Sequence, residues 1–111
     1  MTERGTTILR FGGFEMDTAE RTLKYGDTHV LLAPRAFDTL RMLAENRGRV
    51  LSKERMLAEI WDGSFVEENN LAQNISLLRK VLAERGGGKL IETVPKFGYR
   101  FAAADRDAKP R

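Results

Sequence analysis

The clearest hydrophobic pattern in the chain predicts an amphipathic helix over about residues 67–84. Its apolar positions recur at steps of four, three and four residues: Leu71, Ile75, Leu78 and Leu82. At about 3.6 residues per turn these positions return to one side of a helix, so this side is expected to face a core. Polar side chains fall on the opposite side, with Asn70 and Leu77 on their flank: Asn69, Gln73, Ser76 and Lys80.

An extended segment follows this helix. Residues 90–94 are rich in strand formers, Pro95-Lys96-Phe97-Gly98 has the composition of a turn, and Tyr99-Arg100-Phe101 resumes an extended run. The sequence therefore predicts a β-hairpin whose outer part spans residues 94–100. The glycines at 86–88 are interpreted as a flexible connection between the helix and the hairpin.

The first third of the chain reads as short strands separated by turn residues. The predicted strands are Thr7–Phe11, Phe14–Asp17, Arg21–Tyr25 and His29–Leu32. Four such pieces joined by tight turns predict an antiparallel sheet.

Two more helices are predicted between this sheet and the amphipathic helix. Pro34 suits the first turn of a helix that runs to about Asn46, and Ser52 is expected to cap a second one that ends at Trp61. Their expected buried side chains are Phe37, Leu40, Met42 and Leu43 in the first helix, and Met56, Leu57 and Ile60 in the second. The fold class is thus α+β, with one domain at residues 7–102, an N-terminal tail at 1–6 and a linker or disordered tail at 103–111.

Composition limits the classes of protein to consider. With 111 residues, 41% of them hydrophobic, the chain can bury one small core. It has no cysteine, which excludes disulfides and thiolate metal sites and suits a reducing compartment. No apolar run approaches the roughly 18–20 residues of a membrane span, so the fragment is expected to be soluble and cytoplasmic, without membrane contact.

Catalytic chemistry finds little support, and no cofactor is expected. His29 is the only histidine and has no serine or cysteine nucleophile near it in sequence. The run Gly86-Gly87-Gly88-Lys89 lacks the Ser/Thr and the opening glycine of a phosphate-binding loop. The chain is therefore not expected to be an enzyme.

Charge is unevenly placed, although the formal net charge is only +3. Residues 85–101 carry four basic side chains and one acidic one, whereas residues 67–84 carry two basic and three acidic ones. A polyanion would be attracted mainly by the hairpin, and the helix would offer mostly uncharged polar side chains.

These features together suit duplex DNA. Asn and Gln side chains pair with an adenine edge, and an α-helix fits the major groove. A hairpin with Lys96 at its tip and Arg100 on its return strand would lie along a phosphate backbone or in a minor groove. For the helix alone, a simply solvated outer face is the commoner explanation. The basic hairpin behind it favours a winged helix-turn-helix.

Three stretches carry a family resemblance: LLAPRAFDTLRMLAENRGRVLSKERMLAEIW, NISLLRKVL and LIETVPKFGYRF. In order and spacing, the region from Leu32 to Phe101 resembles the OmpR/PhoB-type winged-helix effector domain of bacterial transcription regulators. Asn-Leu at the start of the third helix and Thr-Val-Pro before the wing are more similar to the CadC/ToxR-like branch. The resemblance implies an N-terminal sheet, three helices and a C-terminal wing, and sequence-specific binding of double-stranded DNA. The alternative is a winged helix that serves protein–protein interaction.

The resemblance also suggests roles for single residues. Thr93 matches a position that reaches DNA, and Arg79 an arginine that commonly meets phosphate. Asn74 stands where many relatives have histidine, and Trp61 where an indole N–H meets phosphate. The candidate DNA-contacting residues are Trp61, Asn69, Asn70, Gln73, Asn74, Ser76, Leu77, Arg79, Lys80, Thr93, Lys96, Tyr99 and Arg100.

Two departures from the family pattern change the expected readout. Leu77 replaces a base-reading arginine of some response regulators, so a contact there would be apolar, for example with a thymine methyl group. Pro95 replaces the minor-groove arginine of many relatives and leaves Lys96 as the nearest cation. The operators of those relatives are therefore not expected to serve this chain.

The resemblance implies further partners. The loop at Asp62, Gly63 and Ser64 corresponds to a segment that touches RNA polymerase in relatives, and relatives bind tandem sites as dimers. A regulatory or sensor domain is expected outside the fragment, in a two-component or one-component signalling protein. If Met1 is the native start, that part follows Arg111, which suits a membrane-anchored full-length protein. If the fragment was excised, an upstream receiver is the alternative.

Overall fold

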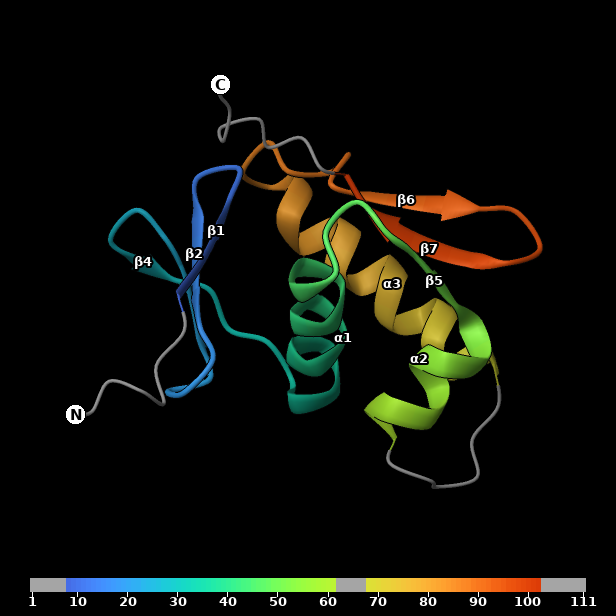
Figure 1. Ribbon diagram of the computed structural model, residues 1–111. Coiled ribbons are helices and arrows are strands. Elements are labelled where there is room, and N and C mark those ends of the chain that lie inside the picture. The colour runs from blue at the N-terminus through green and yellow to red at the C-terminus, as the bar shows by residue number, and fades with distance from the viewer. Residues whose placement is uncertain (1–7, 62–67, 103–111) are drawn as a thin grey trace.

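The computed structural model describes residues 8–61 and 68–102, and the main chain alone at Glu68. The predicted tails at 1–6 and 103–111 lie outside the described residues. The elements follow in the order β1 (Ile8–Phe11), β2 (Phe14–Asp17), β3 (Thr22–Tyr25), β4 (Thr28–His29), α1 (Pro34–Glu45), β5 (Val50–Ser52), α2 (Lys53–Ile60), α3 (Glu68–Ala83), β6 (Ile91–Val94) and β7 (Gly98–Phe101). The predicted α+β winged-helix architecture is confirmed (Figure 1).

The N-terminal sheet pairs each strand with its neighbour in sequence, in the order β1-β2-β3-β4, and all pairs are antiparallel. Along β2 the side chains alternate as expected for a sheet with one covered face. Phe14 and Met16 are buried, whereas Glu15 and Asp17 are only half-buried. The turn before β2 needs Gly13, which has a φ of 89°.

The fourth strand is shorter than predicted. The sequence suggested His29–Leu32, but pairing with β3 covers only Thr28–His29. The Val30 N–H still donates to the Leu23 carbonyl at 2.8 Å, and its side chain is buried. Beyond it the chain leaves the sheet to reach the start of α1, and Leu31 is left 89% exposed. The prediction was wrong here because an apolar run was read as strand where the chain crosses between layers.

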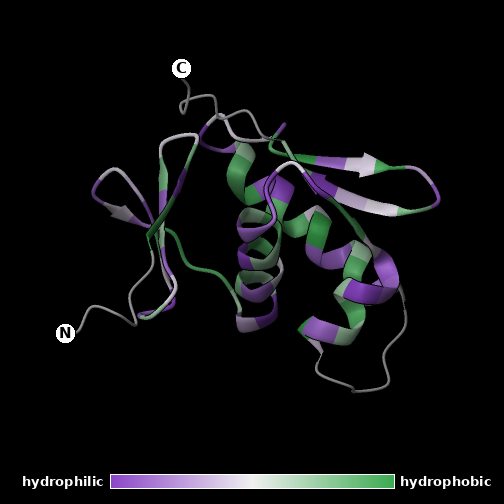
Figure 2. Cartoon of the chain, in the orientation of Figure 1, coloured by the Kyte–Doolittle hydropathy of each residue, from purple (hydrophilic) through white to green (hydrophobic). Residues whose placement is uncertain are grey.

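The first two helices form as predicted. In α1 the side chains of Phe37, Leu40, Met42 and Leu43 are all buried. The Ser52 Oγ accepts the Arg55 N–H at 3.1 Å, which confirms the predicted cap of α2. Met56 and Ile60 of α2 are buried and Leu57 is partly buried against the core. Figure 2 shows hydrophobic and hydrophilic bands alternating along the helices.

Helix α3 buries the predicted apolar row. Leu71, Ile75, Leu78 and Leu82 are each at most 1% exposed, and the helix packs against α1 and α2. By the usual area rule, fully burying a leucine or isoleucine contributes about 1.5–3 kcal/mol, so this row fixes the rotation of α3 about its axis. The opposite side of the helix is thereby turned to solvent.

The hairpin is the main part of a three-stranded antiparallel sheet, called here the wing sheet, with the order β5-β7-β6. No local pattern in the sequence predicted β5. In this pairing Ser52 lies opposite Gly98 and Leu51 opposite Tyr99. A Cβ atom at Gly98 would overlap the Leu51 carbonyl oxygen, so the close approach of β5 requires glycine there.

The two sheets flank the helices and share one core. In Figure 1 the N-terminal sheet stands on one side of α1, and the hairpin β6–β7 extends away on the other. The rings of Phe11 in β1 and Phe101 in β7 meet edge to face, with centroids 5.0 Å apart, where the sheets meet. Within residues 8–61 and 68–102, no helix has the length and apolar character that crossing a bilayer requires.

Candidate nucleic-acid interface

The outward side of α3 presents the polar row that the sequence predicted. Its exposed side chains are Asn69, Asn70, Gln73, Ser76 and Lys80. Leu77 lies among them and is 44% exposed, an apolar group in a polar surrounding. Because the opposite row is buried, these side chains are held outward by the packing of the core. They form one continuous strip of amide, hydroxyl, ammonium and methyl groups.

Arg79 connects this helix to the hairpin. Its Nε and Nη2 donate to the Ile91 carbonyl at 3.3 and 3.1 Å, and Nη2 also donates to the Thr93 Oγ1 at 2.6 Å. Two predicted DNA contacts, Arg79 and Thr93, therefore bind each other. The structure gives them a positioning role that the sequence did not reveal, because the partners are twelve and fourteen residues apart. Their contact with DNA stays a prediction.

Asn74 also has a partner within the protein. Its Nδ2 donates to the Thr39 Oγ1 at 3.2 Å, and that hydroxyl donates to the Arg35 carbonyl at 2.7 Å. Thr39 is fully buried in α1. The side chain of Asn74 thus ties α3 to α1, and a phosphate contact through the same amide stays a prediction.

The tip of the hairpin is a β-turn over Val94–Phe97, in which the Phe97 N–H donates to the Val94 carbonyl at 3.0 Å. Lys96, at the third position, has a φ of 66°. Since Pro95 at the second position cannot adopt a positive φ, this is a type II turn. Lys96 is exposed, as predicted for a cation at the tip.

Tyr99 is only 8% exposed and faces Thr93 across the hairpin. It shares a shallow hollow of about 270 Å³ with Lys53, Asn69 and Ala72. The starts of α2 and α3 meet the wing sheet at this place, so a lysine, an amide and a phenol side chain come together. The sequence analysis did not single out Lys53. Its position immediately after the cap Ser52 was the available signal.

Arg100 is paired with Glu92 on the neighbouring strand. Arg100 Nε lies 2.8 Å from Glu92 Oε1, and the two residues are directly opposite in register. Both side chains are more than two-fifths exposed, so a phosphate group could compete for this guanidinium.

Trp61 follows α2 as its C-cap and is 9% exposed, so its ring packs in the core. The Arg35 guanidinium carbon lies 6.0 Å from the ring centroid. A phosphate contact through the indole N–H stays a prediction. Asp62, Gly63 and Ser64, the predicted polymerase-contact loop, lie outside the described residues.

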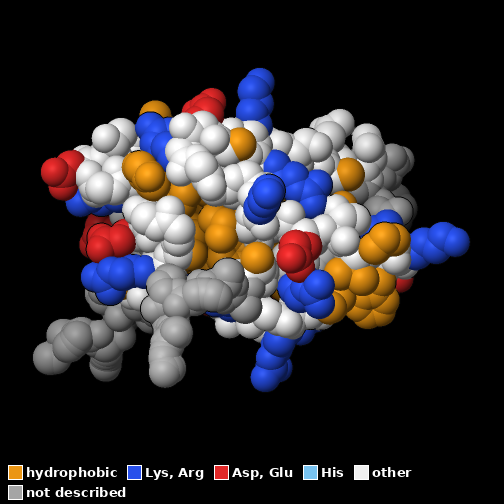
Figure 3. Space-filling view, turned by 90° about the horizontal axis from the view of Figure 1, so that it is seen from above, with side chains coloured by type: hydrophobic (Ala, Val, Ile, Leu, Met, Phe, Trp, Pro, Cys, Tyr) orange, Lys and Arg blue, Asp and Glu red, His pale blue; other side chains and the backbone are white. Residues whose placement is uncertain are grey.

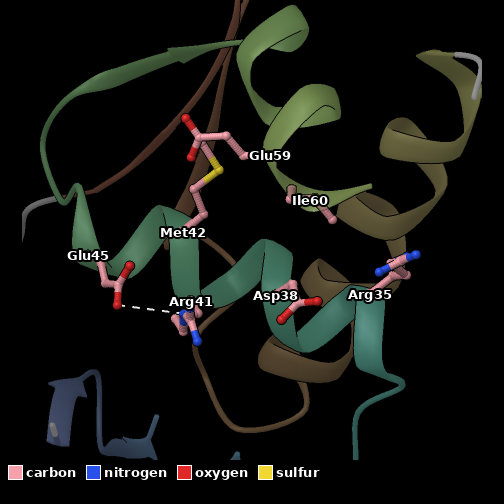
Figure 4. A pocket seen from close by; sticks show the side chains of 7 residues that line it. All are labelled: Arg35, Asp38, Arg41, Met42, Glu45, Glu59 and Ile60. Carbon is pink, nitrogen blue, oxygen red and sulfur yellow. Dashed lines mark ion pairs between the residues drawn. The ribbon is translucent and has the colours of Figure 1, made fainter. Parts of the chain in front are cut away.

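A second hollow, of about 280 Å³, lies between α1 and α2 and is drawn in Figure 4. It is lined by Arg35, Asp38, Arg41, Met42, Glu45, Glu59 and Ile60. Within it Arg41 and Glu45 pair at 3.6 Å, and Asp38 pairs at 2.9 Å with Arg21 outside it. None of the lining residues belongs to α3 or the hairpin, so this hollow is separate from the polar strip. In the described ranges, no cluster of three or more His, Asp or Glu side chains is placed to hold a metal ion.

Comparison with known proteins identifies close architectural relatives. Residues 27–101 match the family described as "Transcriptional regulatory protein, C terminal". The phosphate regulon transcriptional regulatory protein PhoB of Klebsiella pneumoniae is 29% identical over 97 residues, covering 86% of this chain and 42% of PhoB. The chain spans about two-fifths of the length of PhoB and of the other curated relatives compared with it.

Two solved structures extend the comparison. The DNA-binding domain of Escherichia coli CadC is 30% identical, with a TM-score of 0.75 over 85% of this chain and 90% of that domain. The Klebsiella pneumoniae RstA DNA-binding domain, solved in complex with the RstA box, is 28% identical, with a TM-score of 0.74 over 87% of this chain and 98% of that domain. Since PhoB and CadC are almost equally similar to the chain, its place in the CadC-like branch stays a prediction.

Proposed function

The chain belongs to the OmpR/PhoB-type family of transcriptional regulatory proteins, and we propose on that basis that it binds double-stranded DNA sequence-specifically as the effector domain of a bacterial transcription regulator. The observation that carries the proposal is the exposed polar strip of α3, which lies opposite a fully buried row on a helix that Arg79 hydrogen-bonds to a basic hairpin. The RstA domain, a relative of the same fold, is described in complex with its DNA box.

Helix α3 is the proposed reader of the major groove. Gln73 lies centrally on the exposed strip, and its amide can donate and accept on an adenine edge. Asn69, Asn70 and Ser76 offer further hydrogen-bonding groups, and exposed Leu77 suits a thymine methyl group. Lys80 would meet a phosphate.

The hairpin is the proposed contact with the minor groove or the phosphate backbone. Lys96 at the tip and Arg100 on the return strand supply positive charge, while Lys53 and Tyr99 line the hollow between the hairpin and α3. Contacts of this kind position a protein on DNA without selecting a sequence. Sequence preference would come from α3.

The full-length protein extends the proposal. We expect a sensor or receiver domain outside this fragment, tandem binding of two effector domains on DNA, and a polymerase contact through Asp62, Gly63 and Ser64. Alanine substitution of that loop should impair activation and spare DNA binding. Joint loss of both activities would contradict a polymerase-specific role.

The experiment that tests the proposal is selection from a random duplex pool at moderate salt, followed by sequencing of the retained DNA. An enriched motif, repeated at about one helical turn, would support sequence-specific tandem binding. If DNA is retained but no sequence motif is enriched, the chain contacts only the phosphate backbone and does not select a sequence. No retention even at low salt would remove the DNA-binding function.

A matched pair of variants then tests the reader. Gln73→Ala should cost about 1–3 kcal/mol of binding free energy on the selected sequence and relax discrimination at one base. Thr28→Ala, an exposed control in β4, should change neither quantity. An equal loss on selected and unrelated DNA would contradict a base contact by Gln73.

The alternative is a winged helix that binds a protein partner through the same strip. Exposed Leu77 is the observation that favours it, because apolar groups are common in protein interfaces. Dependence of binding on salt separates the two functions, since release of counterions from DNA makes log affinity fall steeply with log salt concentration. A salt-insensitive protein complex with no DNA binding would support the alternative.

A further inference from the structure

The tip of the hairpin holds an aromatic ring in solvent on a fixed backbone. Phe97 is 52% exposed. Its N–H donates to the Val94 carbonyl at 3.0 Å, and its carbonyl accepts the Lys53 N–H at 3.1 Å. Both polar groups of its main chain are therefore bound, one within the turn and one to the start of α2. The ring is exposed because of where the backbone is held, and not because the tip is loose.

The groups around the ring make the tip apolar and cationic at once. Pro95 and Lys96, which precede Phe97 in the turn, are both exposed. Val94, at the start of the turn, is half-buried. Figure 3 shows hydrophobic side chains gathered at the end of the molecule that carries the hairpin, next to a basic side chain that extends into solvent. The positive φ of Lys96 is uncommon for a residue with a side chain, so glycine would form this turn with less strain. The chain keeps a cation there instead.

We propose that Phe97 is an apolar wedge that enters the minor groove of bound DNA and partly opens one base step, with Lys96 on the adjoining phosphate. This inference rests on the proposed DNA-binding function and adds a mode of readout to it. Proteins that bind the minor groove insert apolar side chains between base pairs and bend the duplex. A ring on a hydrogen-bonded turn suits this task, because little main-chain freedom is lost on insertion.

Charge favours DNA over a protein partner for this tip. Residues 85–101 carry an excess of three positive charges, and the ring stands at their outer end. A nucleic acid would satisfy both the cations and the ring, because phosphates border a groove whose floor and walls include apolar edges.

The expected specificity is one of shape. Pyrimidine–purine steps such as TA and CA/TG unstack most easily, so a wedge is accommodated there at the lowest cost. Phe97 would therefore select a deformable step at a position where the chain makes no hydrogen bond to a base. Many relatives have a minor-groove arginine where this chain has Pro95. In this chain Phe97 would respond to how easily a base step unstacks, and not to the negative potential of the groove.

The test uses the purified chain and its selected duplex, with 2-aminopurine placed in turn at each step facing the hairpin. Binding of the wild-type chain should raise the fluorescence at one step, which reports unstacking, and should bend an end-labelled duplex measured by energy transfer. Phe97→Ala should abolish the fluorescence rise, reduce the bend and lower affinity roughly tenfold, in line with loss of one stacking contact. Phe97→Leu should keep part of each signal, because leucine is also an apolar wedge.

Two controls separate the wedge from general effects. Leu31→Ala removes an apolar side chain that is 89% exposed but lies on the link between β4 and α1, and it should change none of these signals. Lys96→Ala should lower the salt dependence of binding, whereas Phe97→Ala should leave it unchanged, since phenylalanine displaces no counterion.

Three results would overturn the wedge. Equal fluorescence and bend for wild type and Phe97→Ala would show that the ring does not enter the duplex. If Phe97→Ala loses cooperative binding to tandem sites but keeps its binding to a single site, the tip contacts the neighbouring protein and not the DNA. If the wild-type chain retains no duplex at any salt concentration, the proposed DNA-binding function fails, and the wedge fails with it. If only the wedge is wrong, the selection still yields an enriched motif.

Discussion

The N-terminal sheet and the wing sheet are both small and antiparallel, but they are held together in different ways. Strands β1 to β4 pair only with their neighbours in sequence. In the wing sheet, β5 pairs with β7, so Val50 lies opposite Arg100 from the far end of the chain. The wing sheet is also bound to α3 through Arg79 and to α2 through Lys53. The strand pairing of the N-terminal sheet is local, whereas that of the wing sheet joins distant parts of the chain.

The two sheets differ in charge as well. Residues 8–29 carry three basic and four acidic side chains, an excess of one negative charge, whereas residues 85–101 carry an excess of three positive charges. The surface proposed to meet DNA is thus on the sheet whose strands come from distant parts of the chain. A surface proposed to meet DNA must be held in a fixed position relative to α3, and the N-terminal sheet contributes buried side chains to the core.

The largest effect is expected from glycine substitutions. Gly98→Ala should destabilise the domain by about 3 kcal/mol, because the new methyl group would overlap the Leu51 carbonyl and force β5 and β7 apart. Gly26→Ala, in the turn between β3 and β4, meets no atom within 4 Å and should cost about 1 kcal/mol through its φ of 61° alone. Urea unfolding of both variants measures the difference. Equal losses would mean that β5 can move without cost.

The link between the hairpin and α3 should have the next largest effect. Arg79→Ala should cost about 2 kcal/mol of stability, since it removes charge-assisted hydrogen bonds to Ile91 and Thr93. In a double-mutant cycle with Thr93→Val the coupling should be about 1 kcal/mol. The exposed neighbour Lys80→Ala should stay within about 0.5 kcal/mol of the wild type. Zero coupling would mean that Arg79 does not hold the hairpin through the Thr93 hydroxyl.

Lysines of the two sheets should differ in their effect on binding. Lys96→Ala should weaken binding to all sequences similarly and lower the slope of log affinity against log salt concentration by about one. Lys24→Ala, on β3, should leave that slope unchanged. Titrations at several salt concentrations give both slopes. If Lys24→Ala lowers the slope and Lys96→Ala does not, the N-terminal sheet is the side that meets DNA.

The smallest effect is expected from two ion pairs with the same geometry. Arg10 and Glu15 lie directly opposite in the N-terminal sheet with N···O at 3.0 Å, as Arg100 and Glu92 do in the wing sheet at 2.8 Å. Being exposed, each should contribute no more than about 0.5 kcal/mol to stability. Glu92→Gln should nevertheless strengthen DNA binding a few-fold, since it frees Arg100 and removes a negative charge, while Glu15→Gln should not. Equal binding by both variants would remove Arg100 from the interface.

The sequence predicted the helices well because their signals are local. The buried row of α3, the start of α1 at Pro34 and the cap of α2 at Ser52 each depend on residues within a few positions of one another. The polar strip follows from the same periodicity, since the side opposite a buried row is exposed.

What the sequence did not predict depends on distant pairing. Strand β5 has only three residues, and nothing near Val50 indicates that β7 lies beside it. The partners of Arg79 and Asn74 were equally invisible, because a contact with Ile91 or Thr39 requires the fold to be known. Leu31 is the opposite case, because its local pattern predicted a strand that does not form there. An apolar side chain was assigned to a strand, although the chain there leaves the sheet.

The tip of the wing sheet is held by main-chain atoms. The N–H groups of Phe97 and Lys53 and the carbonyls of Val94 and Phe97 make its hydrogen bonds, and none of these requires a particular side chain at position 97. Different side chains can therefore occupy position 97 while the turn keeps its shape, whereas the positive φ at position 96 limits the choice there. A regulator built on this frame could be retargeted by exchanging the residue at position 97, with the helix proposed to read the major groove left unchanged.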